Sequence, residues 1–96
     1  MNQEEAKPIL ASQVRELQQR SYAEFRSWVM EKRIETPLVN GTSGTEYQVE
    51  MEARWDSRPG GAIRVLVSVD DGGLVSSLVP LSDAFLISPD GSLLGQ

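Results

Sequence analysis

Apolar and polar residues alternate without a break between residues 46 and 55, which is the clearest pattern in the chain. The odd positions are apolar or aromatic and the even positions are polar or charged. Successive side chains of a β-strand point to opposite faces, so this segment predicts a strand with one face buried and the other in water. Residues 62–69 repeat the pattern and predict a second strand, whose apolar ladder is Ile63, Val65, Val67 and Val69.

The register between these two strands can be argued from charge. Both apolar sets must face the same side, which leaves one register with Glu52 opposite Arg64 and another with Arg54 opposite Arg64. Opposite charges across a ladder attract and like charges repel. The sequence therefore predicts the register that pairs Glu52 with Arg64.

Shorter strands are expected on both sides of this pair. Pro37-Leu38-Val39 predicts a short strand before it. After it, Asp70-Asp71-Gly72-Gly73 predicts a hairpin turn, because Asp71-Gly72 suits a two-residue type I′ loop in which both residues need positive φ. This turn would lead directly into a third strand over residues 74–79.

The C-terminal segment predicts a corner followed by a last hairpin. Residues 80–83 are expected to form the corner, and the apolar residues 84–87 suit either an edge strand or a helical turn capped by Ser82. Ser88-Pro89-Asp90-Gly91 has proline at the second position of a type I turn. Residues 92–94 can then return as a short strand.

The N-terminal part predicts one long amphipathic helix over residues 9–33, preceded by a frayed tail over residues 1–8. Pro37 disfavours helical geometry at Thr36 and ends the segment. Ser21 lies in the middle of the apolar stripe, where a small residue would allow close packing. The stripe follows the 3.6-residue period and contains Leu10, Val14, Leu17, Ser21, Phe25, Trp28 and Val29.

These elements predict a single α+β domain over residues 1–96. One long N-terminal helix would pack on an antiparallel β-meander of three to five strands over residues 37–95, giving two layers. Neither the helix nor the sheet can bury its apolar side alone. The core is expected to combine the strand ladder with Phe25, Trp28, Tyr47 and Trp55.

The composition narrows the function more than it identifies it. The chain has 96 residues with no cysteine and no histidine. This excludes disulfides, thiolate nucleophiles and Cys-ligated metal centres, and removes the commonest general base near neutral pH. We therefore expect a protein that is not an enzyme and that has no cofactor.

The charge distribution argues against nucleic acid as a partner. The net charge is −5, and the whole excess lies in residues 38–96, which carry three basic and eight acidic side chains. Polyphosphate would be repelled by this acidic half. The sequence also shows neither a signal peptide nor a long apolar run, so we expect a cytoplasmic protein that does not bind membranes.

Two acidic turns are candidate ligand sites. Asp70, Asp71 and Asp90 could present carboxylates to a divalent cation or a small ligand. However, Asp and Gly are also the residues that tight turns require for backbone reasons, and the spacing is not that of an EF-hand loop. No metal site is assigned, and a small-ligand or cation-binding module at these turns is one alternative function. Gly41-Thr42-Ser43-Gly44-Thr45 lacks the lysine of a phosphate-binding loop.

A carboxylate-dependent hydrolase is the second alternative. Glu46, Glu50 and Glu52 lie on one face of the predicted strand, and a pair of carboxylates can perform acid–base chemistry. Such a pair needs at least one desolvated member, whereas the alternation places all three in water.

Leu66, Val75 and Val79 are the candidate interface residues. They are expected on the nominally solvent-exposed side of the sheet, and exposed apolar patches often mark an interface. The leading hypothesis is therefore a small protein-interaction domain, which could form a homodimer through the outer sheet face or an edge strand.

The series Asp70-Asp71-Gly72-Gly73, Pro80-Leu81-Ser82-Asp83 and Pro89-Asp90-Gly91-Ser92 resembles a pattern in small uncharacterised bacterial proteins. The resemblance extends over residues 47–95. It implies a bacterial source and no assigned activity. The matching residues are mostly turn formers, so the resemblance carries over no catalytic role.

Overall fold

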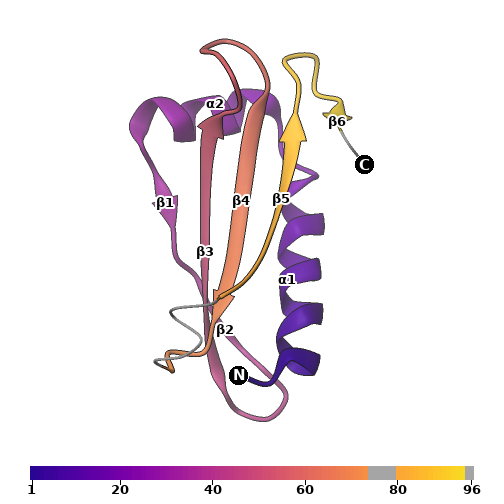
Figure 1. Cartoon of the computed structure of the whole chain (residues 1–96), viewed down its shortest axis with the longest axis vertical. Coiled ribbons are helices and arrows are strands. Elements are labelled where there is room, and N and C mark those ends of the chain that lie inside the picture. Colours follow the sequence, from indigo (N-terminus) through magenta and orange to yellow (C-terminus); the bar gives the residue numbers. More distant parts are fainter. Residues whose placement is uncertain (74–79, 95–96) are drawn as a thin grey trace.

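The computed structural model describes residues 1–73 and 80–94, in which two helices precede an antiparallel sheet (Figure 1). The helices are α1 (Gln3–Leu17) and α2 (Tyr22–Glu31). The sheet in this part of the chain has six strands. These are β1 (Ile34–Glu35), β2 (Leu38–Asn40), β3 (Glu46–Trp55), β4 (Ile63–Asp70), β5 (Leu81–Ile87) and β6 (Leu93–Leu94). The α+β class and the antiparallel sheet agree with the prediction.

The single helix predicted over residues 9–33 is wrong, because the chain breaks into two helices at Ser21. The Ser21 hydroxyl accepts a hydrogen bond from the backbone N–H of Glu24 at 3.1 Å, and Ser21 itself is extended (φ −84°, ψ 156°). Serine favours this N-cap position because it satisfies a free amide of the first turn. The apolar stripe continues across the break because both helices face the same sheet, so periodicity alone did not reveal it.

The frayed tail predicted over residues 1–8 is also wrong. Helix α1 begins at Gln3, and the Asn2 side chain accepts a hydrogen bond from the Glu5 N–H at 3.2 Å. Ala6 is fully buried, which ties this first turn to the core. Pro8 lies inside α1.

Within residues 1–73 and 80–94, the sheet has six strands where three to five were predicted, because its first edge is interrupted. Strands β1 and β2 follow the same register along β3, from Ile34 opposite Glu52 to Asn40 opposite Glu46. Between them, Pro37 accepts a hydrogen bond from the Val49 N–H at 2.9 Å but has no N–H to donate in return. One edge strand is therefore split into two short ones.

The predicted register between β3 and β4 is wrong. Arg54, not Glu52, lies opposite Arg64. Each arginine has a carboxylate of its own nearby, since Arg54 pairs with Glu52 at 3.0 Å and Arg64 with Asp56 at 2.7 Å. These ion pairs along the strand and at its end remove the repulsion on which the prediction relied.

Strand β5 takes the place beside β4. It begins at Leu81, opposite Val69, so residues 81–83 belong to a strand and not to the predicted corner. The apolar residues 84–87 are the edge-strand alternative rather than a helical turn. The Ser88–Gly91 turn and the short strand after it agree with the prediction, with Gly91 N–H bonded to Ser88 C=O at 2.8 Å. The strand predicted over residues 74–79 lies outside the described residues.

The core lies between the helices and one face of the sheet. Helix α1 contacts β4 and β5, whereas α2 contacts β3 and β4. The predicted ladder of odd-numbered residues in β3 and β4 is buried except for Trp55, which is only partly buried. Trp28 and Val67 belong to the same buried cluster, in which Phe25 packs edge-on against Trp28 at 5.4 Å between ring centroids. The predicted two-layer packing is therefore present.

One long-range hydrogen bond ties the second helix to the β3–β4 connection. The Tyr22 hydroxyl donates to the Gly61 carbonyl at 2.7 Å.

Across residues 1–73 and 80–94, no helix combines the length and apolar character that crossing a membrane requires.

Candidate functional site

The face of the sheet opposite the helices, here called the outer face, is the candidate functional site. The register places the even-numbered side chains of β3, β4 and β5 on it, in rows that cross the sheet. One row runs from Ile34 through Glu52 and Leu66 to Ala84. At its two margins the face exposes large apolar side chains, namely Ile34, Leu38 and Leu94. The outer face is therefore mixed in character rather than uniformly polar.

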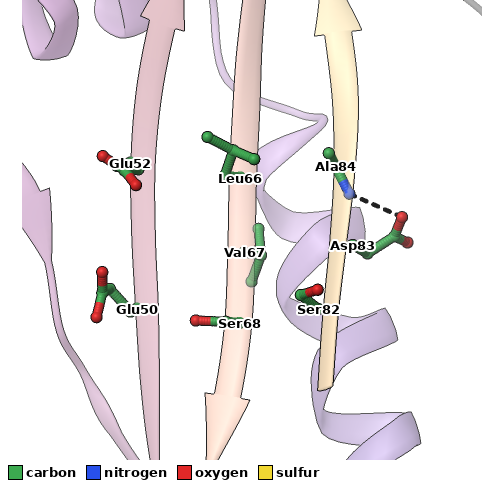
Figure 2. A pocket seen from close by; sticks show the side chains of 8 residues that line it. All are labelled: Glu50, Glu52, Leu66, Val67, Ser68, Ser82, Asp83 and Ala84. Carbon is green, nitrogen blue, oxygen red and sulfur yellow. Dashed lines mark hydrogen bonds between the residues drawn. The ribbon is translucent and has the colours of Figure 1, made fainter. Parts of the chain in front are cut away.

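A shallow hollow of about 360 Å³ lies over the middle strands of this face (Figure 2). Leu66 of the middle strand β4 lies between Glu52 of β3 and Ala84 of β5. Ser68 and Ser82, which are opposite each other across β4 and β5, form the adjacent row. The hollow thus combines one apolar row, Leu66 and Ala84, with hydroxyl and carboxylate groups beside it.

The ionisable side chains of the outer face that line the hollow are both acidic: Glu50 and Glu52. Asp83 also borders the hollow, but its carboxylate is turned to the Ala84 N–H at the edge of β5. Glu52 is half-buried and pairs with Arg54, whereas Glu50 is exposed. The nearest strand arginines, Arg54 and Arg64, lie toward one end of the face and already have carboxylate partners. Among the described residues no cation pairs with Glu50, so a cationic group of a partner would meet uncompensated negative charge there.

The arrangement does not provide the paired carboxylates that the hydrolase hypothesis requires. Glu46 and Glu50 are exposed, as the alternation predicts. Glu52 is the most buried of the three, with 25% of its side chain exposed, and its carboxylate is held by Arg54. The three groups thus lie in water or in an ion pair.

The aspartates of the first acidic turn bind the turn's own backbone. Asp70 accepts a hydrogen bond from the Gly72 N–H at 2.6 Å, and Asp71 accepts one from the Gly73 N–H at 3.0 Å. Gly72 has a φ of +86°, which glycine adopts without strain. These contacts are those of a turn, as the backbone reading of Asp-Gly anticipated. The predicted type I′ loop is wrong, however, because Gly72 has a positive φ whereas Asp71 does not.

Asp90 is similarly committed to its own turn. Its carboxylate accepts hydrogen bonds from the Ser92 N–H at 2.9 Å, from the Ser92 hydroxyl at 2.7 Å and from the Ser88 hydroxyl. The Ser88 and Ser92 hydrogen bonds lower the pKa of Asp90 to about 2. The sheet separates Asp90 from Asp70, since β5 runs between the two turns. Within the described residues, no three acidic side chains gather as a metal site would need.

A cluster that sequence reasoning missed holds the Glu5 carboxylate. Glu5 accepts hydrogen bonds from the Tyr47 hydroxyl at 2.7 Å, from the Ser43 hydroxyl and N–H at 2.7 and 2.9 Å, and from the Thr42 hydroxyl at 3.2 Å. The Tyr47 hydrogen bond is the largest cause that lowers the pKa of Glu5 to about 2, and the same bond raises the pKa of Tyr47 to about 12. We call this cluster the Glu5 clamp.

The Glu5 clamp accounts for Gly41, Thr42 and Ser43 in the β2–β3 connection. A Cβ at Gly41 would lie 2.5 Å from the Glu5 carboxylate, so any other residue there would displace the carboxylate from its partners. The loop that lacks a phosphate-binding lysine thus surrounds a carboxylate of the protein itself. Glu5 and its partners are 37 to 42 residues apart in the chain, so no local motif could have identified the cluster.

Of the three predicted interface residues, only Leu66 can be placed. It is half-buried in the hollow of the outer face. Val75 and Val79 lie outside the described residues.

Comparison of the chain with protein-family models, curated proteins and solved structures gave no match. The resemblance over residues 47–95 therefore stays a prediction.

Proposed function

We propose that this protein is a protein-interaction domain whose outer face binds an amphipathic helix with basic side chains on a partner protein. The observation that carries the proposal is the contrast in layering: two helices cover one face of the sheet, whereas the other face displays Leu66 in a hollow. A sheet with apolar groups on an uncovered face gains stability when a second layer buries them.

The chemistry of the partner follows from the hollow. It offers Leu66 and Ala84 as apolar groups, and the ionisable side chains beside them are the carboxylates of Glu50 and Glu52. A helix that presents leucine toward Leu66 and Ala84 and lysine or arginine toward Glu50 would match both properties. A second copy of the chain matches less well, because the net charge of −5 makes two copies repel each other.

The test uses a synthetic amphipathic helix of leucine and lysine, with a scrambled peptide of the same composition as its control. We expect the amphipathic peptide to shift backbone amide signals of outer-face residues in the NMR spectrum, including those of Leu66 and Ala84. The scrambled peptide should leave these signals unchanged. The Leu66→Asn and Glu50→Gln variants should each weaken binding, by about tenfold for the first, equivalent to about 1.4 kcal/mol.

Three results would overturn the proposal. One is the absence of any shift at millimolar peptide. Another is an equal response to the scrambled peptide, which would indicate charge attraction alone. The third is self-association of the free protein through Leu66, detected by light scattering, which would make a second copy the occupant of the outer face.

A further inference from the structure

The side of β5 that faces away from β4 is an open strand edge over most of its length among the described residues. The proposed function does not depend on this edge. Strand β6 pairs only with Leu86 and Ile87, and among the described residues no other strand lies along this side of β5. The Ser88 N–H donates to the Ser92 carbonyl at 2.9 Å, so the backbone groups of residue 88 point toward β6. Alternate residues of a strand point the same way. The backbone N–H groups of Ser82 and Ala84 are therefore directed at the open edge.

Asp83 occupies this edge with its side chain. The register places it opposite Val67, on the side of the sheet that faces the core, yet Asp83 is exposed. Its carboxylate accepts a hydrogen bond from the Ala84 N–H at 2.8 Å (Figure 2). The donor that an added strand would need at Ala84 is thus already used, and a negative charge lies beside it.

We propose that the β5 edge is a strand-pairing surface for a second copy of this chain and that the Asp83 carboxylate keeps it closed. Two copies that met here about a two-fold axis would pair antiparallel and continue the sheet from one molecule into the next. With the axis at residue 83, each Asp83 would lie directly opposite its copy, and like charges in that position repel. A charged residue on a sheet edge is a recognised barrier to such pairing.

The residues on either side of Asp83 suit this arrangement. Phe85 and Ile87 are buried on the core side of β5, and Leu81 is partly buried there. Once the two strands were paired, the apolar layer of one copy would continue toward that of the other. Asp83 is the charged position in this series, so its replacement by an apolar β-branched residue would make the strand uniform.

The experiment compares the oligomeric state of the wild type with that of Asp83→Val by light scattering over a range of concentrations. We expect a monomeric wild type, and a variant whose dimer dissociation constant is lower by about tenfold or more, equivalent to about 1.4 kcal/mol. Asp83→Asn removes the charge but keeps an acceptor for the Ala84 N–H, so we expect a smaller decrease. Asp83→Asn also serves as the test variant if Asp83→Val does not fold.

Three controls locate the contact. Glu50→Val makes the same chemical change in the middle of the sheet and should leave the protein monomeric. Adding Ser82→Pro to Asp83→Val removes an N–H at the open edge without breaking the β4 ladder, and should restore the monomer. Adding Leu66→Glu should leave the dimer intact, which separates this edge from the outer face.

The amide of Ala84 provides a direct readout of the pairing. In the Asp83→Val dimer it should exchange with solvent more slowly as the concentration rises. The inference is overturned if Asp83→Val and Asp83→Asn both stay monomeric at millimolar concentration. It is also overturned if the dimer persists with Ser82→Pro, or if the wild type already dimerises with a protected Ala84 amide.

Discussion

The two faces of the sheet are built from alternate residues of the same strands, yet they have different physical roles. Val67 is 1% exposed beneath the helices, whereas its neighbour Leu66 is half-buried in the hollow of the outer face. Burial of an aliphatic side chain contributes about 1.5–3 kcal/mol, and only the inner face receives this contribution in full. The comparison teaches that the inner face carries most of the stability of the fold, so the outer face can be changed with little loss of stability.

The largest expected effect tests whether stability depends on the inner face. Replacing Trp28 by alanine removes a side chain that is 2% exposed and leaves a cavity beside Phe25. We expect the free energy of unfolding to fall by about 3–5 kcal/mol, measured by urea denaturation. Leu66→Ala is the control on the other face and should cost about 1 kcal/mol or less. Equal losses in the two variants would contradict the division of roles.

A smaller effect tests how the second helix is held over the inner face. Ser21→Ala removes the N-cap of α2, and we expect the free energy of unfolding to decrease by about 1 kcal/mol. Ser12→Ala changes an exposed serine in α1 and should be neutral. If the two substitutions had the same effect in urea, the break between the helices would not depend on the Ser21 cap.

The smallest effect concerns the Glu5 clamp, which joins α1 to the end of the inner face at Tyr47. The pKa of Glu5 is lowered from 4.5 to about 2 in the folded chain. Its stabilisation is therefore present above pH 4.5 and lost as the pH falls toward 2. We expect the stability difference between wild type and Glu5→Gln, measured by thermal unfolding, to shrink over this range. Gly41→Ala should behave like Glu5→Gln, since its Cβ displaces the carboxylate.

A constant difference between wild type and Glu5→Gln from pH 6 to pH 2 would rule out the clamp. Asp90 also has a lowered pKa and contributes to the acid sensitivity of the wild type. Asp90 contributes equally to the pH dependence of the Glu5→Gln variant, so the difference between the two proteins isolates the contribution of Glu5.

Strands β3 and β4 and the burial of one face could be predicted from the sequence because a single period governs them. Strict alternation requires only that side chains of neighbouring residues point to opposite sides. The helices were less accessible to such reasoning, because the stripe continues through Ser21 whether or not the backbone breaks there. The N-cap depends on the single Ser21 hydroxyl, and the 3.6-residue spacing of apolar residues gives no information about it.

The β3–β4 register and the Glu5 clamp could not be predicted, because the residues that decide them do not belong to any periodic pattern in the sequence. Glu52 and Asp56 pair with Arg54 and Arg64 from outside the cross-strand pair and offset the repulsion between the two arginines. The Glu5 clamp joins the first turn of the chain to the β2–β3 connection, and only the folded chain brings these together. Of the candidate site, Leu66 was identified by its apolar character on a polar face, whereas the hollow around it depends on three strands.

The order of the strands has a kinetic consequence. Short connections over residues 41–45, 56–62 and 88–92 join β2 to β3, β3 to β4 and β5 to β6, so little loop-closure entropy opposes these hairpins. The bonds between the helical region and the sheet, such as that from Tyr22 to Gly61, span far longer stretches of chain. Hairpins should therefore form before the helices dock. The apolar ladder of β3 and β4 should therefore remain exposed to water until the helices dock. Because exposed apolar surface promotes aggregation, the refolding yield should fall as protein concentration rises.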